Sequence, residues 1–153
     1  MREMTHVGGR PILRAALAGL TYFGVVFAAG FALGTLRILV LAPRLGDGLA
    51  IGLELPIMLA LSWLACRRLI TGFDVPTTLI ARLAMGVLAF AILMLAELGI
   101  STLAFGRSFS AHFDHYRQLP AMLGLAGQIT FALFPIIQRK NGLQSRVSEL
   151  PHR

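Results

Sequence analysis

Two carboxylates, Glu54 and Glu97, lie inside long apolar stretches of this sequence of 153 residues. An ionisable side chain in hydrocarbon is costly and marks a candidate functional site. Such a carboxylate can bind and release a proton or a cation along an outward-facing cavity, or it can pair with an arginine and fasten helices together. Arg37 and Arg44 are the arginines that the sequence brings to the same depth, so they belong to this candidate site.

Gln128 is a further polar candidate, because it lies at the middle of another apolar stretch. Its amide can form up to four hydrogen bonds, and such a bond between membrane helices contributes about 0.6 to 2 kcal/mol. We expect Gln128 to hold helices together. The alternative is that Gln128, which lies deeper than the carboxylates, extends a polar path inward.

The elements that must position these residues follow from the composition. Hydrophobic residues make up 56% of the chain and charged residues only 14%, whereas soluble domains carry about 25% charged residues. This composition excludes a soluble globular enzyme, a disordered chain and, with a single cysteine, a disulfide-stabilised scaffold. Four apolar runs are each long enough to span a bilayer as a helix. We expect these helices at about residues 15–40, 48–66, 78–103 and 119–137.

The runs predict an all-α fold, an integral membrane bundle of four transmembrane helices that forms a single domain over residues 1–153. A transmembrane β-barrel would need segments of alternating polarity, and these runs do not alternate. Residues 138–153 are expected to form a basic cytoplasmic tail.

The orientation of the bundle follows from the arginines and lysines in the short connections. Ten of the 14 basic residues lie on the side of both chain ends, and four lie on the other side. Because cytoplasmic connections carry the excess of positive charge, both termini are expected in the cytoplasm of a bacterial inner membrane. Glu54, Glu97 and Arg37 then fall in the outer half of the bilayer.

Small residues recur at the spacing that allows close packing of membrane helices. Gly30 and Gly34 form one G-x-x-x-G pair, and Gly48 and Gly52 form another that Pro56 extends by one more turn. These glycine ridges can pack inside the bundle, which we expect, or face a second protomer or a partner subunit. Pro56 also removes a backbone hydrogen-bond donor, which predicts a kink in its helix.

The connection over residues 105–118 predicts a short helix lying in the membrane interface, because its aromatic residues share one face. His112, Asp114 and His115 lie in the same connection, but three residues within four positions cannot all face one ion on a helix. No metal site is therefore expected. No histidine lies inside the four runs, so they cannot supply the paired histidines of a membrane haem, and no cofactor is expected.

The net charge of +7 does not indicate nucleic-acid binding, because the basic residues lie between the apolar runs, where they orient helices. No catalytic motif with a nucleophile and a base is present, so an enzyme is not expected. The expected partners are the lipid bilayer and a second copy of the chain or a larger membrane complex.

The stretch over residues 34–48, GTLRILVLAPRLGDG, is followed by Glu54-Leu55-Pro56 and Ser62-Trp63. Together these residues resemble a group of small, uncharacterised four-helix proteins of the bacterial inner membrane, a resemblance that implies no particular activity. The sequence thus leaves two functions open. The first is a non-enzymatic accessory or structural membrane protein that associates through its glycine ridges, and the alternative is a small proton- or cation-coupled transporter that uses Glu54 and Glu97.

Overall fold

A computed structural model describes residues 9–104, 106, 108, 110 and 117–148 of the chain. All the regular structure in these residues is helical, which confirms the all-α prediction. The elements are the α-helices α1 (Gly9–Leu36), α2 (Ala42–Leu45), α3 (Asp47–Gly72), α4 (Leu79–Gly99) and α6 (Leu119–Ser148), and the π-helical segments η1 (Arg37–Leu41) and η2 (Ile100–Ala104).

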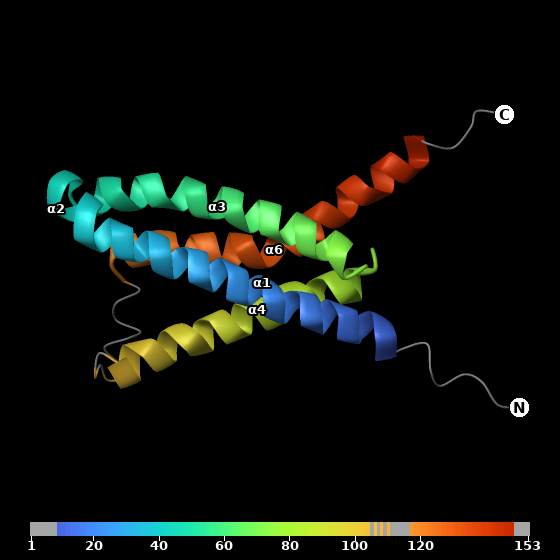
Figure 1. Ribbon diagram of the computed structural model, residues 1–153, viewed down its shortest axis with the longest axis horizontal. Coiled ribbons are helices and arrows are strands. Elements are labelled where there is room, and N and C mark those ends of the chain that lie inside the picture. Colours follow the sequence, from blue (N-terminus) through green and yellow to red (C-terminus); the bar gives the residue numbers. More distant parts are fainter. Residues whose placement is uncertain (1–8, 105, 107, 109, 111–116, 149–153) are drawn as a thin grey trace, which may run out of the picture.

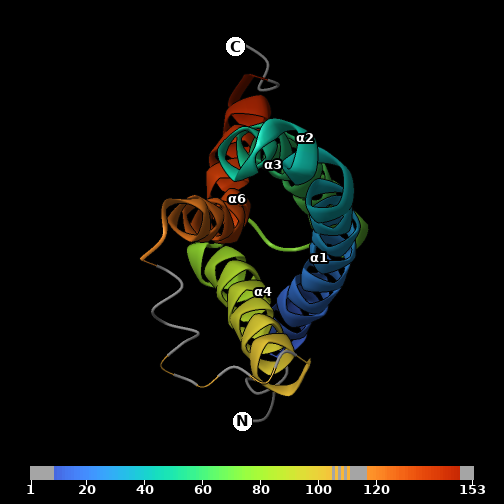
Figure 2. The same cartoon turned by 90° about the vertical axis from the view of Figure 1, so that its left-hand side faces the viewer.

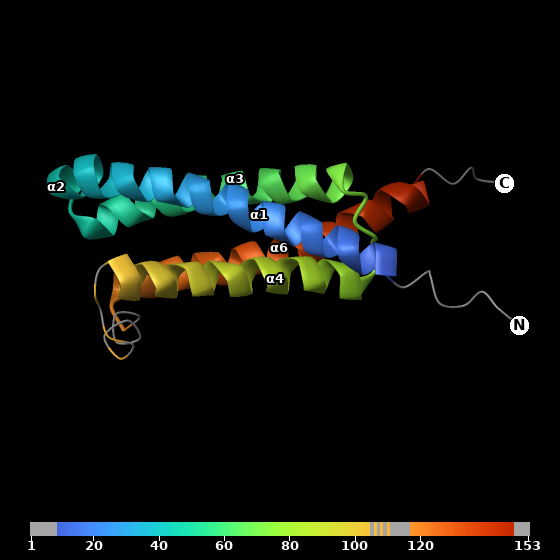
Figure 3. The same ribbon diagram turned by 60° about the horizontal axis from the view of Figure 1, so that its bottom comes forward.

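The four long helices form two antiparallel pairs. Helix α1 continues through η1 into α2, and α3 returns alongside it, while α4 and α6 form the second pair (Figures 1 and 3). Viewed along the bundle, α1 packs on α3 and α4, and α6 packs on the same two helices, so the four helices close a ring (Figure 2). We call the end of the bundle that holds α2 the α2 end; η2 ends there and α6 begins there.

Four helical segments are long and apolar enough to cross a membrane, which agrees with the number expected from the sequence. Three of the helices extend beyond their apolar runs. The first begins at Gly9, the second continues to Gly72, and the fourth continues to Ser148, so much of the expected 138–153 tail is helical. Hydropathy reports where the chain is apolar, whereas a helix continues through charged residues until a breaking residue or a cap ends it.

The outer face of the bundle is strongly apolar. In the most apolar window of the first span only 6% of the residues are buried, so most of its hydrophobic side chains point away from the other helices. Large exposed side chains occur on every long helix, for example Leu13, Leu49, Ile80 and Leu119. Apolar surface of this extent on a soluble monomer would cause aggregation, and it is the surface that a lipid environment favours.

Two glycines on neighbouring helices allow the backbones to approach closely. A methyl group built on Gly19 of α1 would lie 2.7 Å from the carbonyl oxygen of Met85 in α4. One built on Gly86 of α4 would overlap the carbonyl oxygen of Ala132 in α6. Glycine is therefore required at both positions by the helix–helix distance, as is common in membrane bundles.

The glycine pairs predicted from the sequence behave differently from each other. A methyl group on Gly30 would lie 3.2 Å from Met58 Cε, and one on Gly34 would lie 3.8 Å from Glu54 Oε1, so this pair packs inside the bundle. At Gly48 and Gly52 no atom of the described residues lies within 4 Å of such a group. Internal packing, which the sequence favoured for these ridges, is therefore not seen for the second pair.

Pro135 lies within α6 and leaves the carbonyl of Phe131 without its helical hydrogen bond, because proline has no N–H. The Tyr22 hydroxyl of α1 donates a hydrogen bond to this carbonyl over 3.1 Å, and the rings of Tyr22 and Phe131 stack with centroids 4.3 Å apart. Tyr22 thus fastens α1 to α6 across the ring. Beyond this region α6 changes direction (Figure 1), as expected of a proline-containing helix.

The connection between α3 and α4 is held by Arg82, in the first turn of α4. Its side chain is buried, and Nε donates to the carbonyl of Pro76 over 3.0 Å. Thr78 caps α4 by accepting from the Ala81 N–H. The aromatic face predicted for residues 105–118 and the cluster of His112, Asp114 and His115 lie outside the described residues.

Candidate polar cavity between the helices

A cavity of about 690 Å³ lies between the four long helices at the α2 end of the bundle and reaches its middle. Most of its wall is apolar and includes Val26, Phe27, Leu55, Leu93 and Phe131. A cavity of this volume is within the range that binds small organic molecules. The polar residues proposed from the sequence, with the exception of Arg44, line the same cavity. Arg44 lies in α2 and is exposed.

Arg37 and Glu54 form an ion pair in the cavity wall. Arg37 Nε lies 2.5 Å from Glu54 Oε2, and the two side chains are 24% and 17% exposed. Arg37 is the first residue of η1 and Glu54 lies in α3, so the pair joins the first and second spans. The common depth inferred from the sequence thus corresponds to a direct contact.

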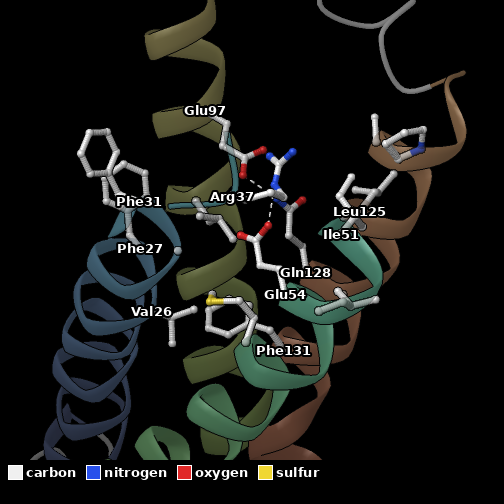
Figure 4. A pocket seen from close by; sticks show the side chains of 18 of the residues that line it. Val26, Phe27, Phe31, Arg37, Ile51, Glu54, Glu97, Leu125, Gln128 and Phe131 are labelled. Atoms are coloured by element: carbon white, nitrogen blue, oxygen red, sulfur yellow. Dashed lines mark hydrogen bonds and ion pairs between the residues drawn. The ribbon is translucent and has the colours of Figure 1, made fainter. Parts of the chain in front are cut away.

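Glu97 and Gln128 form the matching contact between the other two helices. Gln128 Nε2 of α6 donates a hydrogen bond to Glu97 Oε1 of α4. Figure 4 shows that the Glu54 and Glu97 carboxylates both turn towards the Arg37 guanidinium, with the Gln128 amide beside them. The sequence placed Gln128 deeper than the carboxylates, but its side chain reaches the same level. All four long helical segments therefore contribute a side chain to one polar layer.

Two hydrogen-bonding oxygens at the cavity have no partner among the described residues. They are Gln128 Oε1 and Ser101 Oγ, and both atoms are buried. A buried polar atom without a hydrogen bond costs about 1–3 kcal/mol. The Gln128 amide N–H is already bonded to Glu97, so the unmatched atom of this side chain is its oxygen, Oε1. This oxygen can accept a hydrogen bond from a molecule in the cavity.

Both π-helical segments border this layer. In η1 the Ala42 N–H bonds to the Arg37 carbonyl, five residues earlier, and η2 begins three residues after Glu97 and contains Ser101. Segments of this kind are rare in proteins and occur frequently at functional sites. These segments could not be predicted from the sequence, because neither residues 37–41 nor residues 100–104 carry a signal that distinguishes π from α geometry.

The cavity wall carries an excess of negative charge. Its charged residues are one arginine, Arg37, and three carboxylates, Asp47, Glu54 and Glu97. Asp47 was not proposed from the sequence; it is the first residue of α3 and lies exposed at the rim. The described residues contain no group of three or more histidine, cysteine or acidic side chains arranged to hold a metal ion. This chemistry suits the binding of an organic cation or the exchange of a proton.

Comparison of the chain with protein-family models, curated proteins and solved structures found no match. The interpretation of the cavity therefore depends on its own residues. Their arrangement provides the Arg37–Glu54 ion pair, a second carboxylate turned towards the same guanidinium, an unmatched amide oxygen and an apolar chamber.

Proposed function

We propose that this chain is a non-enzymatic multi-pass protein of a bacterial inner membrane that acts as a small proton- or cation-coupled carrier. The supporting observation is that the Glu54–Arg37 and Glu97–Gln128 contacts lie on the wall of a cavity. Polar pairs that only fasten helices need no chamber beside them, and well-packed apolar residues would fasten the helices at least as well.

Both termini are proposed to be cytoplasmic, so the α2 end and the cavity mouth face the outside. The distribution of basic residues supports this orientation. A cysteine introduced at the exposed Asp74, between α3 and α4, is then protected from a membrane-impermeant maleimide in intact cells. Labelling without permeabilisation would reverse the orientation.

The shared arginine supplies a mechanism. Glu54 and Glu97 together carry one negative charge more than Arg37 neutralises, and both carboxylates turn towards its guanidinium (Figure 4). A proton or cation that binds to one carboxylate neutralises it, and Arg37 then pairs with the other carboxylate. The layer is therefore close to neutral while the proton or cation is bound. Loading and release therefore change the partners of Arg37, which joins the first span to the others.

Proton or cation flux in proteoliposomes tests the carrier. We expect Glu54→Gln and Glu97→Gln to abolish flux driven by a pH gradient. Asp74→Asn is the matched control, because it makes the same chemical change in an exposed connection outside the cavity. If both glutamine variants are folded and support the same flux as the wild type, the carboxylates do not carry the load. If the variants only lose stability and the wild type shows no flux, the carboxylates hold the helices together and do not take part in transport.

An accessory role is the second candidate, and the exposed ridge of Gly48, Gly52 and Pro56 on α3 favours it. Since no described atom contacts a methyl group built on either glycine, this face is open to a second copy of the chain. We expect Gly52→Leu to reduce crosslinked dimer in native membranes. Gly24→Leu, an equally open position on α1, is the control. Equal crosslinking in both variants would exclude the ridge as the contact.

A further inference from the structure

The charge of the cavity wall indicates the sign of its ligand. Three carboxylates and one arginine give a net charge of −2, of which −1 belongs to the layer formed by Arg37, Glu54 and Glu97. Anionic ligands would add to an existing excess of negative charge and would be repelled by it. A single positive charge neutralises the layer.

The unmatched oxygens indicate that the positively charged group of the ligand also carries hydrogen-bond donors. Gln128 Oε1 can only accept, and the Ser101 hydroxyl can accept as well. A primary ammonium or a guanidinium group offers N–H donors to these oxygens and to a carboxylate together. A quaternary ammonium group has the same charge but no N–H, so it would leave both oxygens unmatched. The described residues contain no group of three or more histidine, cysteine or acidic side chains that could hold a metal ion, so the cavity gives no support to a metal as the ligand.

The remaining wall indicates an apolar body. Beside and below the polar layer the chamber is lined by aromatic and aliphatic side chains, including Phe31 at the level of Arg37 and Phe27 and Phe131 further down (Figure 4). Aromatic faces also attract cations. A molecule with a cationic head at the level of Glu97 and a hydrocarbon or aromatic tail directed towards Phe131 would match both parts of the chamber.

We propose that the cavity binds an amphipathic monocation whose head carries N–H donors, that is, a hydrophobic primary amine or guanidine. This inference rests on the proposed carrier function and names its substrate class. The probe is 4-phenylbutylamine, and three compounds with the same body are compared with it: the trimethylammonium analogue, the alcohol and the carboxylic acid. Binding is measured by calorimetry with the protein in lipid nanodiscs, after subtraction of the heat with empty nanodiscs.

We expect the wild-type protein to bind the amine at least about tenfold more tightly than the alcohol, and not to bind the acid. The quaternary analogue should bind more weakly than the amine. Gln128→Leu should reduce this preference for the amine, and Asp74→Asn should change nothing. Equal binding of the amine and the alcohol would refute a cationic site, and equal binding of the two cations would refute the role of the N–H donors. These comparisons need only the wild-type protein, so they stand even if a cavity variant fails to fold.

The two proposals fail separately. If the amine binds as expected but enters proteoliposomes no faster than protein-free liposomes, the site is correct and the carrier function is wrong. If the wild-type protein supports a proton flux that 4-phenylbutylamine does not inhibit, and if the amine is not transported in response to the pH gradient, the carrier function holds and the substrate class is wrong.

Discussion

The hydrogen bond from Tyr22 to the Phe131 carbonyl makes a prediction that a double-mutant cycle can test. Pro135 deprives this carbonyl of its helical donor, and the Tyr22 hydroxyl replaces it at 3.1 Å in a fully buried position. Tyr22→Phe retains the ring, so the stacking on Phe131 is preserved and only the donor is lost. An unmatched buried carbonyl costs about 1–3 kcal/mol in soluble proteins, and hydrogen bonds between membrane helices average about 0.6 kcal/mol. We expect a loss of about 1 kcal/mol.

Pro135→Ala changes the expected cost, because the introduced alanine supplies an N–H that can bond to the Phe131 carbonyl within α6. In this background Tyr22→Phe should cost almost nothing, which gives a coupling energy of about 1 kcal/mol between the two positions. The free energy of unfolding in mixed detergent–SDS micelles measures all four corners of the cycle. Any packing loss caused by removing the buried proline cancels in the comparison. An equal cost of Tyr22→Phe in both backgrounds would refute the proposed role of the hydroxyl.

Two further changes test the packing and the polar layer. Gly19→Ala places a methyl group 2.7 Å from the Met85 carbonyl oxygen, which is closer than ordinary van der Waals contact. We therefore expect it to lower the stability of the detergent-solubilised protein by about 1–3 kcal/mol. Gly24→Ala is the control and should not lower the stability, because no described atom lies within 4 Å of its methyl group. Arg37→Gln should destabilise the fold by about 1–3 kcal/mol, because Glu54 loses its ion pair, and adding Glu54→Gln should recover most of the loss. Thermal unfolding measures both effects, and failure of the second substitution to rescue the first would contradict the pairing.

The helices could be predicted from the sequence because their signal is local. Each apolar run of about 20 residues is sufficient to predict one helix, and four helices long and apolar enough to cross a membrane are found in the described residues. Their ends were predicted less well. Arg67 and Arg68 end the second apolar run but not α3, since arginine is a good helix former and the helix continues to Gly72. Residues 138–148 likewise contain no residue that must end a helix.

The contacts of the site could be predicted only in part. Depth along a helix follows from counting residues, and three of the residues that it grouped, Arg37, Glu54 and Glu97, line one cavity, whereas Arg44 does not. Which face of a helix meets which neighbour depends on the rotation of every helix about its axis, and no single span encodes it. For this reason the sequence pointed to Gly48 and Gly52, whereas the closest backbone contacts involve other glycines. The π-helical segments were missed because their cause is tertiary.

The polar layer is difficult to explain by stability alone. An ion pair removed from water contributes little net energy, because desolvation offsets most of its attraction. Two buried oxygens without partners among the described residues add a further cost, and the two π-helical segments replace α-helical hydrogen bonds with poorer ones at the same level of the bundle. These features all border one cavity. Departures from good local structure that concentrate at one place are typical of a functional site, since only a function retained through selection offsets their cost.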